Sequence, residues 1–332
     1  MNLEIALAAD DNFAMQMGIC IMSIVETNEE FFDMINIHIL NNGISKDNIQ
    51  KLKYLKKKYE KLNYFFYDVE FIKRVIPVPE KGNPFYHLGF STYSRLFLAK
   101  LIDKSIKRIL YLDSDILING NLFDLYNVDF NDFYCAGVID PFVKNIKNTL
   151  NMKENSIYIN AGVLLINLEK WRSENIEDNF IQFFYNFPSK LINDQNIINK
   201  VFEEKIVPVD LKYNVSPIFF NINYKKFLEF NNFNESEIQE YYTSESFAIA
   251  VNNPIIIHFI GWVWCRPWEK RCNNPYTKKY LYYKDKSPWK HFELKKINIL
   301  SKIRKLIIRK IFELLPGIIT FHIFKIVQLL RY

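Results

Sequence analysis

The sequence has 332 residues, which is long enough for one large α/β domain with an appendage or for two smaller domains. Hydrophobic residues make up 49% and charged residues 24%, a balance typical of a folded soluble protein. The net charge of +6 is concentrated near the C-terminus, whereas a nucleic-acid-binding protein would scatter basic patches among aromatic residues, so we expect no nucleic-acid partner.

Strands and helices alternate along the first third of the chain. Residues 3–9 form a continuous apolar run that indicates a buried strand, and residues 46–61 place apolar side chains at helical spacing beside a Lys-rich face. This alternation favours an open, mostly parallel α/β sheet with helices on both faces. We expect strands at 3–9, 35–40, 63–69 and 108–113, and helices at 15–28, 46–61 and 91–102.

The second half of the chain is less regular. Its composition changes near residue 270, where a Tyr- and Lys-rich segment leads into a basic tail. We therefore expect a main domain over residues 1–270 and an aromatic, basic C-terminal extension with helices over residues 271–332. Within the main domain, strands are expected at 134–140, 160–168, 206–210 and 254–260, and one amphipathic helix at 169–187.

The four cysteines, Cys20, Cys135, Cys265 and Cys272, form no CxxC pair, so we expect no structural zinc site. Their sparse spacing does not suggest a disulfide scaffold either, and reduced thiols in a cytosolic protein are the expectation. The N-terminal residues lack a basic leader followed by an apolar segment, so we expect no signal peptide. No uninterrupted apolar run approaches the length of a membrane span.

Polar side chains gather at the carboxyl ends of the predicted strands, where open α/β sheets bind ligands. Asp10 and Asn12 follow the first strand, Asp113 and Asp115 follow the fourth, and His258 lies near the end of the last. Two ionised carboxylates so close together repel each other, and a divalent cation between them would cancel that repulsion. Since carboxylates with one imidazole suit Mn²⁺ or Mg²⁺, we predict that Asp113, Asp115 and His258 bind one of these metals.

Each of these features also has a plain structural interpretation. A D-x-D tripeptide is short and common, and most matches are solvated loops. A single His near a strand end is more often structural than ligating, and Asp10 and Asn12 are also typical turn formers. The position of Asp113 and Asp115 directly after the apolar run "ILYL" favours the metal site.

Six segments together resemble the retaining glycosyltransferases of family 8, especially the bacterial lipopolysaccharide galactosyl- and glucosyltransferases. In chain order, from Ala8 to about Trp268, they are "AADDNFA", "STYSRL", "YLDSDIL", "NAGVLLINLEKWR", "DQNIIN" and "HFIGWVWCRPW". The later "YYKDKSPWK" is similar to a C-terminal segment of the lipopolysaccharide-core members. On this combination the chain is identified as a member of the family.

The resemblance implies a GT-A fold with the catalytic domain in residues 1–270, a UDP-sugar donor, and Mn²⁺ or Mg²⁺ between protein and diphosphate. It implies that Ser114 lies against the ribose, and that Gln195 sits beneath the anomeric carbon. Gln195, Asp194 and Arg95 are the implied catalytic residues. The implied donor-binding residues are Ala8, Ala9, Asp10, Asn12, Arg95, Asp113, Ser114, Asn160, Ala161, Asp194, Gln195, His258, Gly261 and Arg266.

One motif departs from the family pattern. The family usually reads H-x-x-G-x-x-K-P-W, with the Lys six residues after the His. Here Arg266 stands eight residues after His258, which is a two-residue insertion with a Lys-to-Arg change. Because an Arg can neutralise a diphosphate bidentately, we assign Arg266 to that role.

The implied retention of configuration has two possible routes. A double displacement needs a carboxylate nucleophile beneath the sugar. The matched position holds Gln195, a poor nucleophile, so we prefer front-face substitution, in which the leaving phosphate helps to deprotonate the acceptor. Asp194 as nucleophile is the alternative.

The basic tail carries seven Lys or Arg residues and no acid between residues 295 and 310. Ile303, Leu306 and Ile307 recur at helical spacing, a pattern that suits the interface of an anionic bilayer. The alternative is a helix packed on the catalytic domain. Because the implied acceptor is lipid-linked, we favour a cytoplasmic protein bound peripherally to the inner face of the bacterial cytoplasmic membrane.

The leading functional hypothesis is transfer of galactose or glucose from a UDP-sugar to a lipid-linked oligosaccharide in lipopolysaccharide or lipooligosaccharide biosynthesis. Two alternatives stay open. One is a metal-dependent phosphohydrolase or nucleotidyltransferase that uses the same D-x-D motif. The other is a non-catalytic homologue that binds sugar nucleotides.

Overall fold

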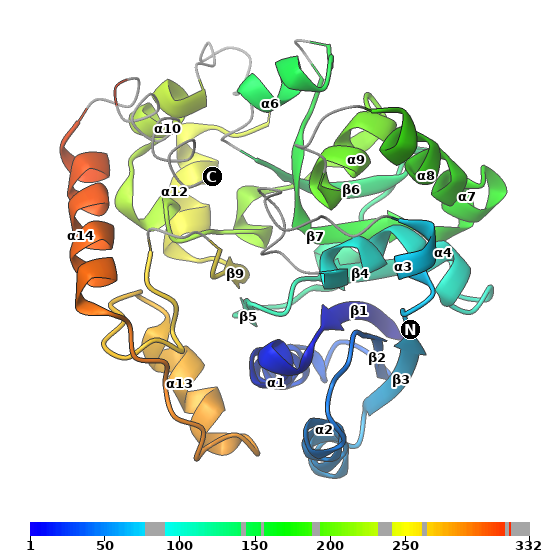
Figure 1. The fold of residues 1–332 in the computed structure, drawn as a ribbon, viewed down its shortest axis with the longest axis horizontal. Coiled ribbons are helices and arrows are strands. Elements are labelled where there is room, and N and C mark those ends of the chain that lie inside the picture. Colours follow the sequence, from blue (N-terminus) through cyan, green and yellow to red (C-terminus); the bar gives the residue numbers. More distant parts are fainter. Residues whose placement is uncertain are drawn as a thin grey trace.

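The computed structural model describes residues 1–76, 90–140, 144–153, 156–187, 193–231, 241–260 and 264–315, together with residue 319. A seven-stranded sheet in the order β3-β2-β1-β4-β7-β6-β8 forms the centre of the fold (Figure 1). The first four strands in that order are parallel, β7 is antiparallel to both β4 and β6, and β8 is parallel to β6. The mostly parallel α/β sheet predicted from the sequence is therefore confirmed. The strands are β1 (Leu3–Ala9), β2 (Ile35–Asn41), β3 (Leu62–Asp68), β4 (Arg108–Leu112), β6 (Cys135–Ile139), β7 (Ile159–Asn167) and β8 (Ile206–Pro208).

Each face of the sheet has its own hydrophobic core. Because successive side chains of a strand point to opposite faces, Leu110 and Leu112 of β4 enter one core while Ile109 and Tyr111 enter the other. The first core lies under α1 (Ala14–Asn28), α2 (Lys46–Lys58) and α13 (Thr277–Lys286). The second lies under η3 (Phe90–Phe97), α4 (Leu98–Leu101), α7 (Leu168–Ser173), α8 (Ile176–Asn186) and α9 (Asp194–Val201).

A small second sheet pairs β5 (Ile116–Ile118) with β9 (Ile256–His258) in antiparallel register, with Ile116 opposite His258. This small sheet follows the carboxyl end of β4. It places β9, which is distant in the sequence, beside the segment that follows β4. The remaining elements are η1 (Asp11–Phe13), α3 (Ile72–Val75), α5 (Phe123–Tyr126), α6 (Lys144–Thr149), η4 (Leu211–Tyr213), η5 (Phe219–Asn221), α10 (Tyr224–Asn231), α12 (Ser244–Asn252) and α14 (Ile299–Leu314).

Two of the predicted helices are interrupted in the structure, and the helix predicted over residues 46–61 ends at Lys58. Residues 91–102 form the 3-10 helix η3 followed by the short α4, and the Ser94 hydroxyl donates to the carbonyl of Ser91, three residues earlier. Residues 169–187 lie in two helices, α7 and α8. The break falls at Asn175, whose left-handed backbone (φ 49°) cannot continue a right-handed helix.

The expectation of four reduced thiols is also wrong. Cys265 and Cys272 form a disulfide, with their Cα atoms 5.3 Å apart. The two cysteines are seven positions apart, and the chain turns back between them. Their spacing in the sequence does not reveal this pairing. Cys20 and Cys135 are buried free thiols.

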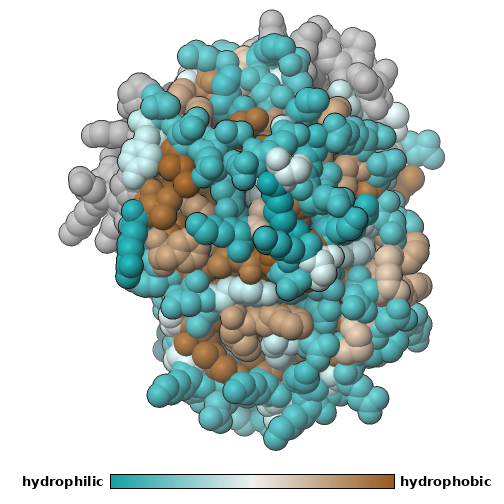
Figure 2. Space-filling view, turned by 90° about the vertical axis from the view of Figure 1, so that its right-hand side faces the viewer, coloured by the Kyte–Doolittle hydropathy of each residue, from teal (hydrophilic) through white to brown (hydrophobic). Residues whose placement is uncertain are grey.

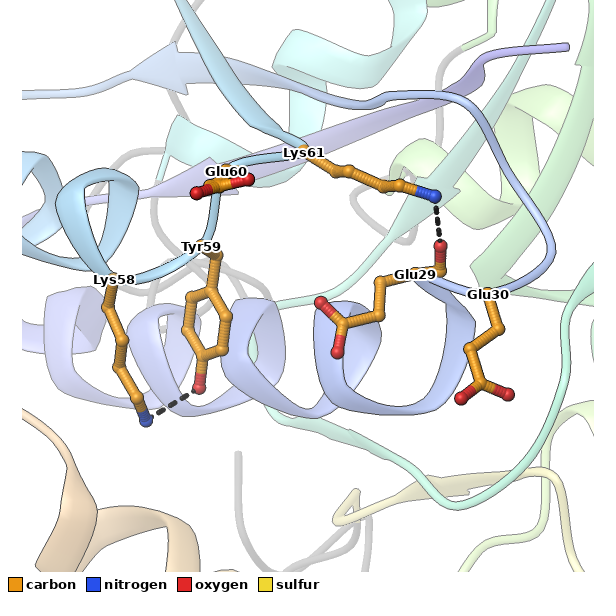
Figure 3. Close-up of a pocket in the computed structure, with 6 residues that line it drawn as sticks. All are labelled: Glu29, Glu30, Lys58, Tyr59, Glu60 and Lys61. Atoms are coloured by element: carbon orange, nitrogen blue, oxygen red, sulfur yellow. Dashed lines mark hydrogen bonds between the residues drawn. The ribbon is translucent and has the colours of Figure 1, made fainter.

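Hydrophilic side chains cover most of the face in Figure 2, and the hydrophobic ones form separate patches. A shallow polar hollow lies where α1 ends and α2 leads into β3, and Lys61 in it donates to the carbonyl of Glu29 (2.6 Å). It is lined by Glu29, Glu30, Lys58, Tyr59, Glu60 and Lys61 (Figure 3). Within the described ranges, no helix combines the length and the hydrophobicity that crossing a membrane requires.

Candidate functional site

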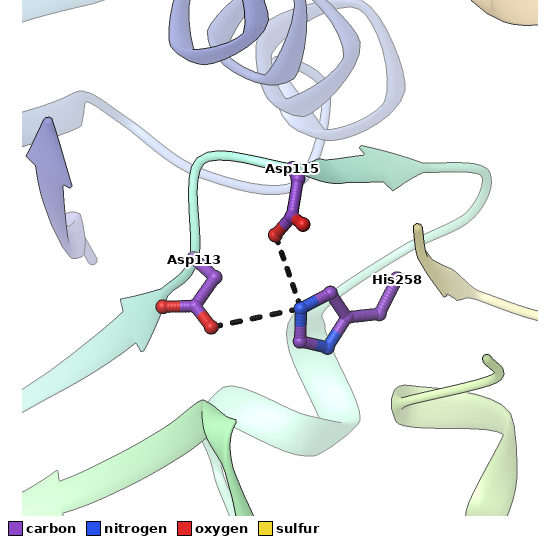
Figure 4. Close-up of side chains that lie close together, drawn as sticks. All are labelled: Asp113, Asp115 and His258. Carbon is purple, nitrogen blue, oxygen red and sulfur yellow. Dashed lines mark hydrogen bonds and ion pairs between the residues drawn. The ribbon is translucent and has the colours of Figure 1, made fainter. Parts of the chain in front are cut away.

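Asp113, Asp115 and His258 meet beyond the carboxyl end of β4. Asp113 follows the last residue of β4, and Asp115 precedes β5, whose pairing with β9 brings His258 opposite Ile116. The Nε2 atom of His258 lies 3.1 Å from Oδ1 of Asp115 and 3.6 Å from Oδ2 of Asp113 (Figure 4). We call this cluster of three side chains the carboxylate edge.

The antiparallel direction of β7 brings the start of that strand to the same place. The amide of Asp113 donates to the carbonyl of Gly162 (2.8 Å), so residues 160–162 lie beside the carboxylate edge. A Cβ atom at Gly162 would overlap the His258 ring and would lie 2.7 Å from Oδ2 of Asp113. This close approach explains why a glycine stands in "NAGV".

Two asparagines fix the orientation of the His258 ring. Asn160 accepts the amide N–H of Gly162 through Oδ1 (3.0 Å), and that same oxygen accepts from Nδ2 of Asn214 (2.9 Å). Because the side-chain nitrogen of Asn214 donates to Asn160, its Oδ1 faces Nδ1 of His258 (3.0 Å) and accepts a hydrogen bond from the Nδ1–H group. In the neutral ring this leaves the lone pair of Nε2 directed at the two carboxylates.

The carboxylate edge consequently presents only acceptors at close range. Its candidate ligand atoms, one from each residue, lie within 4.8 Å of one another. A lone pair beside two carboxylates calls for a cation, and one nitrogen with carboxylate oxygens suits Mn²⁺ or Mg²⁺. Burial works to raise the pKa of Asp115, but the charge and hydrogen bond that His258 supplies when Nε2 also carries a proton, together with the charge of Arg266, outweigh it, so the pKa lies below its usual value. Asp115 is thus held ionised, as a metal ligand must be.

Arg95 lies buried beneath the carboxylate edge. Its guanidinium pairs with Oδ1 of Asp113 (2.8 Å) and Oδ2 of Asp194 (3.0 Å), and it also donates to the carbonyl of Ala161. It stacks on the Tyr111 ring, 4.3 Å from the centroid. Because Arg95 is only 2% exposed, it holds the two carboxylates in place from below.

Asp194 and Gln195 begin α9, which Asn193 caps through a hydrogen bond to the amide of Asn196. The Gln195 side chain is held at both ends. Its Oε1 accepts from the amide of Ala161 (3.1 Å) and from Nδ2 of Asn160 (3.2 Å). Its Nε2 donates to Oδ2 of Asp140 (3.1 Å) and to the Tyr158 hydroxyl (3.3 Å).

The turn after β1 carries Asp10 and Asn12, two of the predicted donor-binding residues. Asp10 caps η1, and its Oδ1 accepts from the amides of Asn12 (3.0 Å) and Phe13 (3.2 Å), so it is a turn former. The Ser114 hydroxyl donates to the carbonyl of Ala8 (2.8 Å), which ties this turn to the carboxylate edge. Ala9 is buried at the end of β1.

Arg266 lies near enough to the carboxylate edge for its charge to act on Asp115. Its backbone amide donates to Glu269 (3.0 Å), and its guanidinium lies over the Trp268 ring, 5.7 Å from the centroid. Its positive charge helps to lower the pKa of Asp115, after the larger effect of His258. Gly261 lies outside the described residues.

The geometry matches a known enzyme family. A family model described as glycosyl transferase family 8 matches residues 4–272. The chain belongs to glycosyl transferase family 8. The matched range includes both the sheet and the carboxylate edge. The match confirms the membership predicted from the six sequence segments.

Two curated relatives of this family-8 chain match it along most of their length. General stress protein A of Bacillus subtilis (strain 168) is 25% identical over 294 residues, which are 86% of this chain and 94% of that protein. Lipopolysaccharide 1,2-glucosyltransferase of Escherichia coli is 26% identical over 302 residues, which are 88% of this chain and 81% of that protein. The crystal structure of galactosyltransferase LgtC, in complex with donor and acceptor sugar analogs, has a TM-score of 0.68 at 24% identity, covering 87% of this chain and 96% of that one. This likeness confirms the GT-A fold.

Three residues of this family-8 site were not among those predicted to bind the donor or the metal or to act in catalysis. Asp140 and Tyr158 hold Gln195, and Asn214 orients His258. Asp140 follows β6 at the same edge of the sheet, and that position was a usable signal. Asn214 follows η4 and reaches the site only because its neighbour Val215 pairs with β9, so no local pattern announced it.

Proposed function

We propose that this protein is a retaining glycosyltransferase that moves glucose or galactose from a UDP-sugar to a lipid-linked oligosaccharide in lipopolysaccharide or lipooligosaccharide biosynthesis. The family membership and the relative named lipopolysaccharide 1,2-glucosyltransferase support this class of reaction. The donor would lie across the turn of residues 10–12 and the carboxylate edge, which Ser114 connects.

The arrangement of Asp194 and Gln195 carries the proposed route. A double displacement needs a free carboxylate, yet Asp194 is 5% exposed and its Oδ2 is paired with Arg95 at 3.0 Å. The neighbouring Gln195 has an amide, which is a poor nucleophile. Both facts support front-face substitution, in which the departing phosphate takes the acceptor's proton and Gln195 steadies the sugar from below.

Asp113, Asp115 and His258 would hold Mn²⁺ or Mg²⁺ against the donor diphosphate. When bound, such an ion stabilises the negative charge of the leaving UDP as a Lewis acid. Arg266 would add a second positive charge near the diphosphate. Arg95 pairs with both Asp113 and Asp194, so its positive charge balances the two carboxylates from below.

Helix α14 supports the proposed attachment to an anionic membrane surface. Its inward side packs Ile308, which is 6% exposed, and makes the Lys305–Glu269 ion pair (3.3 Å). Its outward side is apolar, with Leu306 53% and Ile307 55% exposed. Lys310 is also exposed, so basic and apolar groups face solvent together. The exposed apolar residues of α14 are Leu300, Ile303, Leu306, Ile307 and Leu314.

The test is incubation with UDP-glucose or UDP-galactose, Mn²⁺ and lipooligosaccharide, followed by measurement of UDP release and by NMR of the product's anomeric carbon. The proposal expects release of UDP from one of the two donors and an α-linked product. A β-linked product would contradict retention. Release of nucleotide or phosphate without sugar transfer or free hexose would favour a phosphohydrolase instead.

A further inference from the structure

The turn of residues 10–13, which we call the donor turn, contacts the C-terminal part of the chain. Trp289 packs against α1 at Gly18, where a Cβ atom would overlap the indole ring, and it is 2% exposed. Its Nε1–H donates to Oδ1 of Asn48 in the first turn of α2 (2.8 Å). Thus a residue near position 290 fills a space between two N-terminal helices.

Asn48 connects Trp289 to the donor turn through a second hydrogen bond. Its Nδ2 donates to Oδ1 of Asp11 (2.7 Å), and the same oxygen accepts from the amide of Ser45 (2.8 Å). The Asn48 bond is the largest cause that lowers the pKa of Asp11. Because Trp289 occupies the oxygen of Asn48, the amide nitrogen of Asn48 must face Asp11.

The segment that presents Trp289 is itself fixed. The buried Lys284 donates through Nζ to the carbonyl of Lys290 (2.8 Å), and the Ser287 hydroxyl accepts from the amide of Trp289 (3.1 Å). A second contact joins the same part of the chain to the donor turn, since Phe13 meets Trp268 edge to face at 6.5 Å between centroids. The donor turn is therefore held from two points of the 264–290 segment.

We propose that Trp289 is a positioning residue for donor binding, acting through Asn48 and Asp11 on the donor turn. This inference rests on the proposed function, because it takes the donor turn as the place where the uridine of the donor binds. Only an indole both fills the space at Gly18 and carries an N–H to Asn48. The "SPWK" segment thus sets the affinity for the nucleotide rather than only closing the core.

The test compares Trp289→Phe with Trp171→Phe in isothermal titration of the full-length protein with UDP and Mn²⁺. Trp171 is a matched control, since it is 1% exposed and its Nε1–H makes one hydrogen bond, to the carbonyl of Tyr134 (2.9 Å), far along the chain from the donor turn. Loss of one hydrogen bond in the relay should weaken UDP binding by about fivefold. Trp171→Phe should lower the melting temperature but leave the UDP affinity unchanged.

A double-mutant cycle with Asn48→Ala separates positioning from packing. In a relay, Asn48→Ala alone should weaken UDP binding as Trp289→Phe does, and the double variant should bind no worse than either single variant. Unchanged UDP affinity in Trp289→Phe, or additive losses in the cycle, would overturn the inference. Wild-type protein that binds no UDP would overturn the proposed function itself, and the inference with it.

Discussion

The carboxylate edge and helix α14 arrange polar and apolar groups in opposite ways. At the carboxylate edge, charged and amide groups point inward and are held by partners from distant segments of the chain, as His258 is held by Asn214. On α14, the polar contacts of Lys305 face the domain while Leu306 and Ile307 face solvent. The first arrangement fixes the positions of the groups proposed for metal binding and catalysis. The second exposes an apolar surface of the kind that contacts a lipid bilayer.

This difference implies that the two regions have separate roles, catalysis at the carboxylate edge and membrane attachment at α14. The carboxylate edge depends on preorganisation, so single substitutions there should change catalysis or metal binding by large factors. The outward side of α14 makes few contacts within the described chain, so substitutions there should change attachment and leave catalysis intact. Each prediction below tests one side of this comparison.

The largest effect is expected for Asp115→Asn. It removes a charged metal ligand while Arg95 keeps its pairs with Asp113 and Asp194, so the fold should persist. Transfer should fall by on the order of 10³-fold, measured as UDP release with saturating Mn²⁺. Asp132→Asn is the matched control, because it removes an exposed carboxylate paired with Lys170. Comparable rates in the two variants would refute the metal assignment.

Gln195→Ala should have the next largest effect. The amide lies among Asp140, Tyr158 and Ala161, away from the donor turn, so turnover should fall by roughly 10²-fold while UDP affinity stays unchanged. Rates come from initial velocities and affinity from calorimetry, with the exposed Gln182→Ala as control. Isolation of a covalent glycosyl adduct on Asp194 in the wild-type protein would show double displacement instead.

Asn214→Ala tests how the carboxylate edge is organised. Without its oxygen, His258 loses the bond that places the proton on Nδ1, so Mn²⁺ affinity should drop by about 10- to 100-fold. Electron paramagnetic resonance of free Mn²⁺ measures this directly, without turnover. Asn221→Ala, which loses one hydrogen bond to the carbonyl of Pro217, is the control. Equal Mn²⁺ affinity in both variants would mean that Asn214 does not orient the ligand.

The double substitution Leu306→Gln and Ile307→Gln tests the outward side of α14. It keeps Ile308 and the Lys305–Glu269 pair, so the helix should stay in place. Binding to anionic vesicles should weaken by about tenfold, as judged by co-sedimentation at low salt. Ile249→Gln on α12, where the side chain is 50% exposed, should have no effect. Undiminished vesicle binding by the α14 variant would exclude a membrane role for this surface.

Periodic apolar patterns predicted the frame of the molecule well. The first strand, residues 3–9, was predicted with the bounds that β1 has, because a continuous buried run leaves no other solution. The rule that ligands gather at the carboxyl ends of strands also anticipated that Asp113, Asp115 and His258 would meet. Features that depend on the local sequence pattern were therefore accessible.

Features that depend on contacts between distant segments were not accessible. Asn214 gains its place from the pairing of Val215 with β9, and Trp289 gains its place from the absence of a side chain at Gly18. The left-handed residue Asn175 breaks a helix whose apolar periodicity continues unbroken in sequence. In each case a tertiary contact or a single backbone conformation outweighs the pattern.

The most direct test of these separate roles measures two properties, UDP release and vesicle binding, on the same protein preparations. Wild type, Asp115→Asn and the α14 double variant are each assayed for UDP release from UDP-glucose and UDP-galactose with Mn²⁺, and for co-sedimentation with anionic vesicles. The account predicts that Asp115→Asn loses UDP release but still binds vesicles, and that the α14 variant does the reverse. UDP release by Asp115→Asn at the wild-type rate, or loss of both properties in either variant that remains folded, would contradict it.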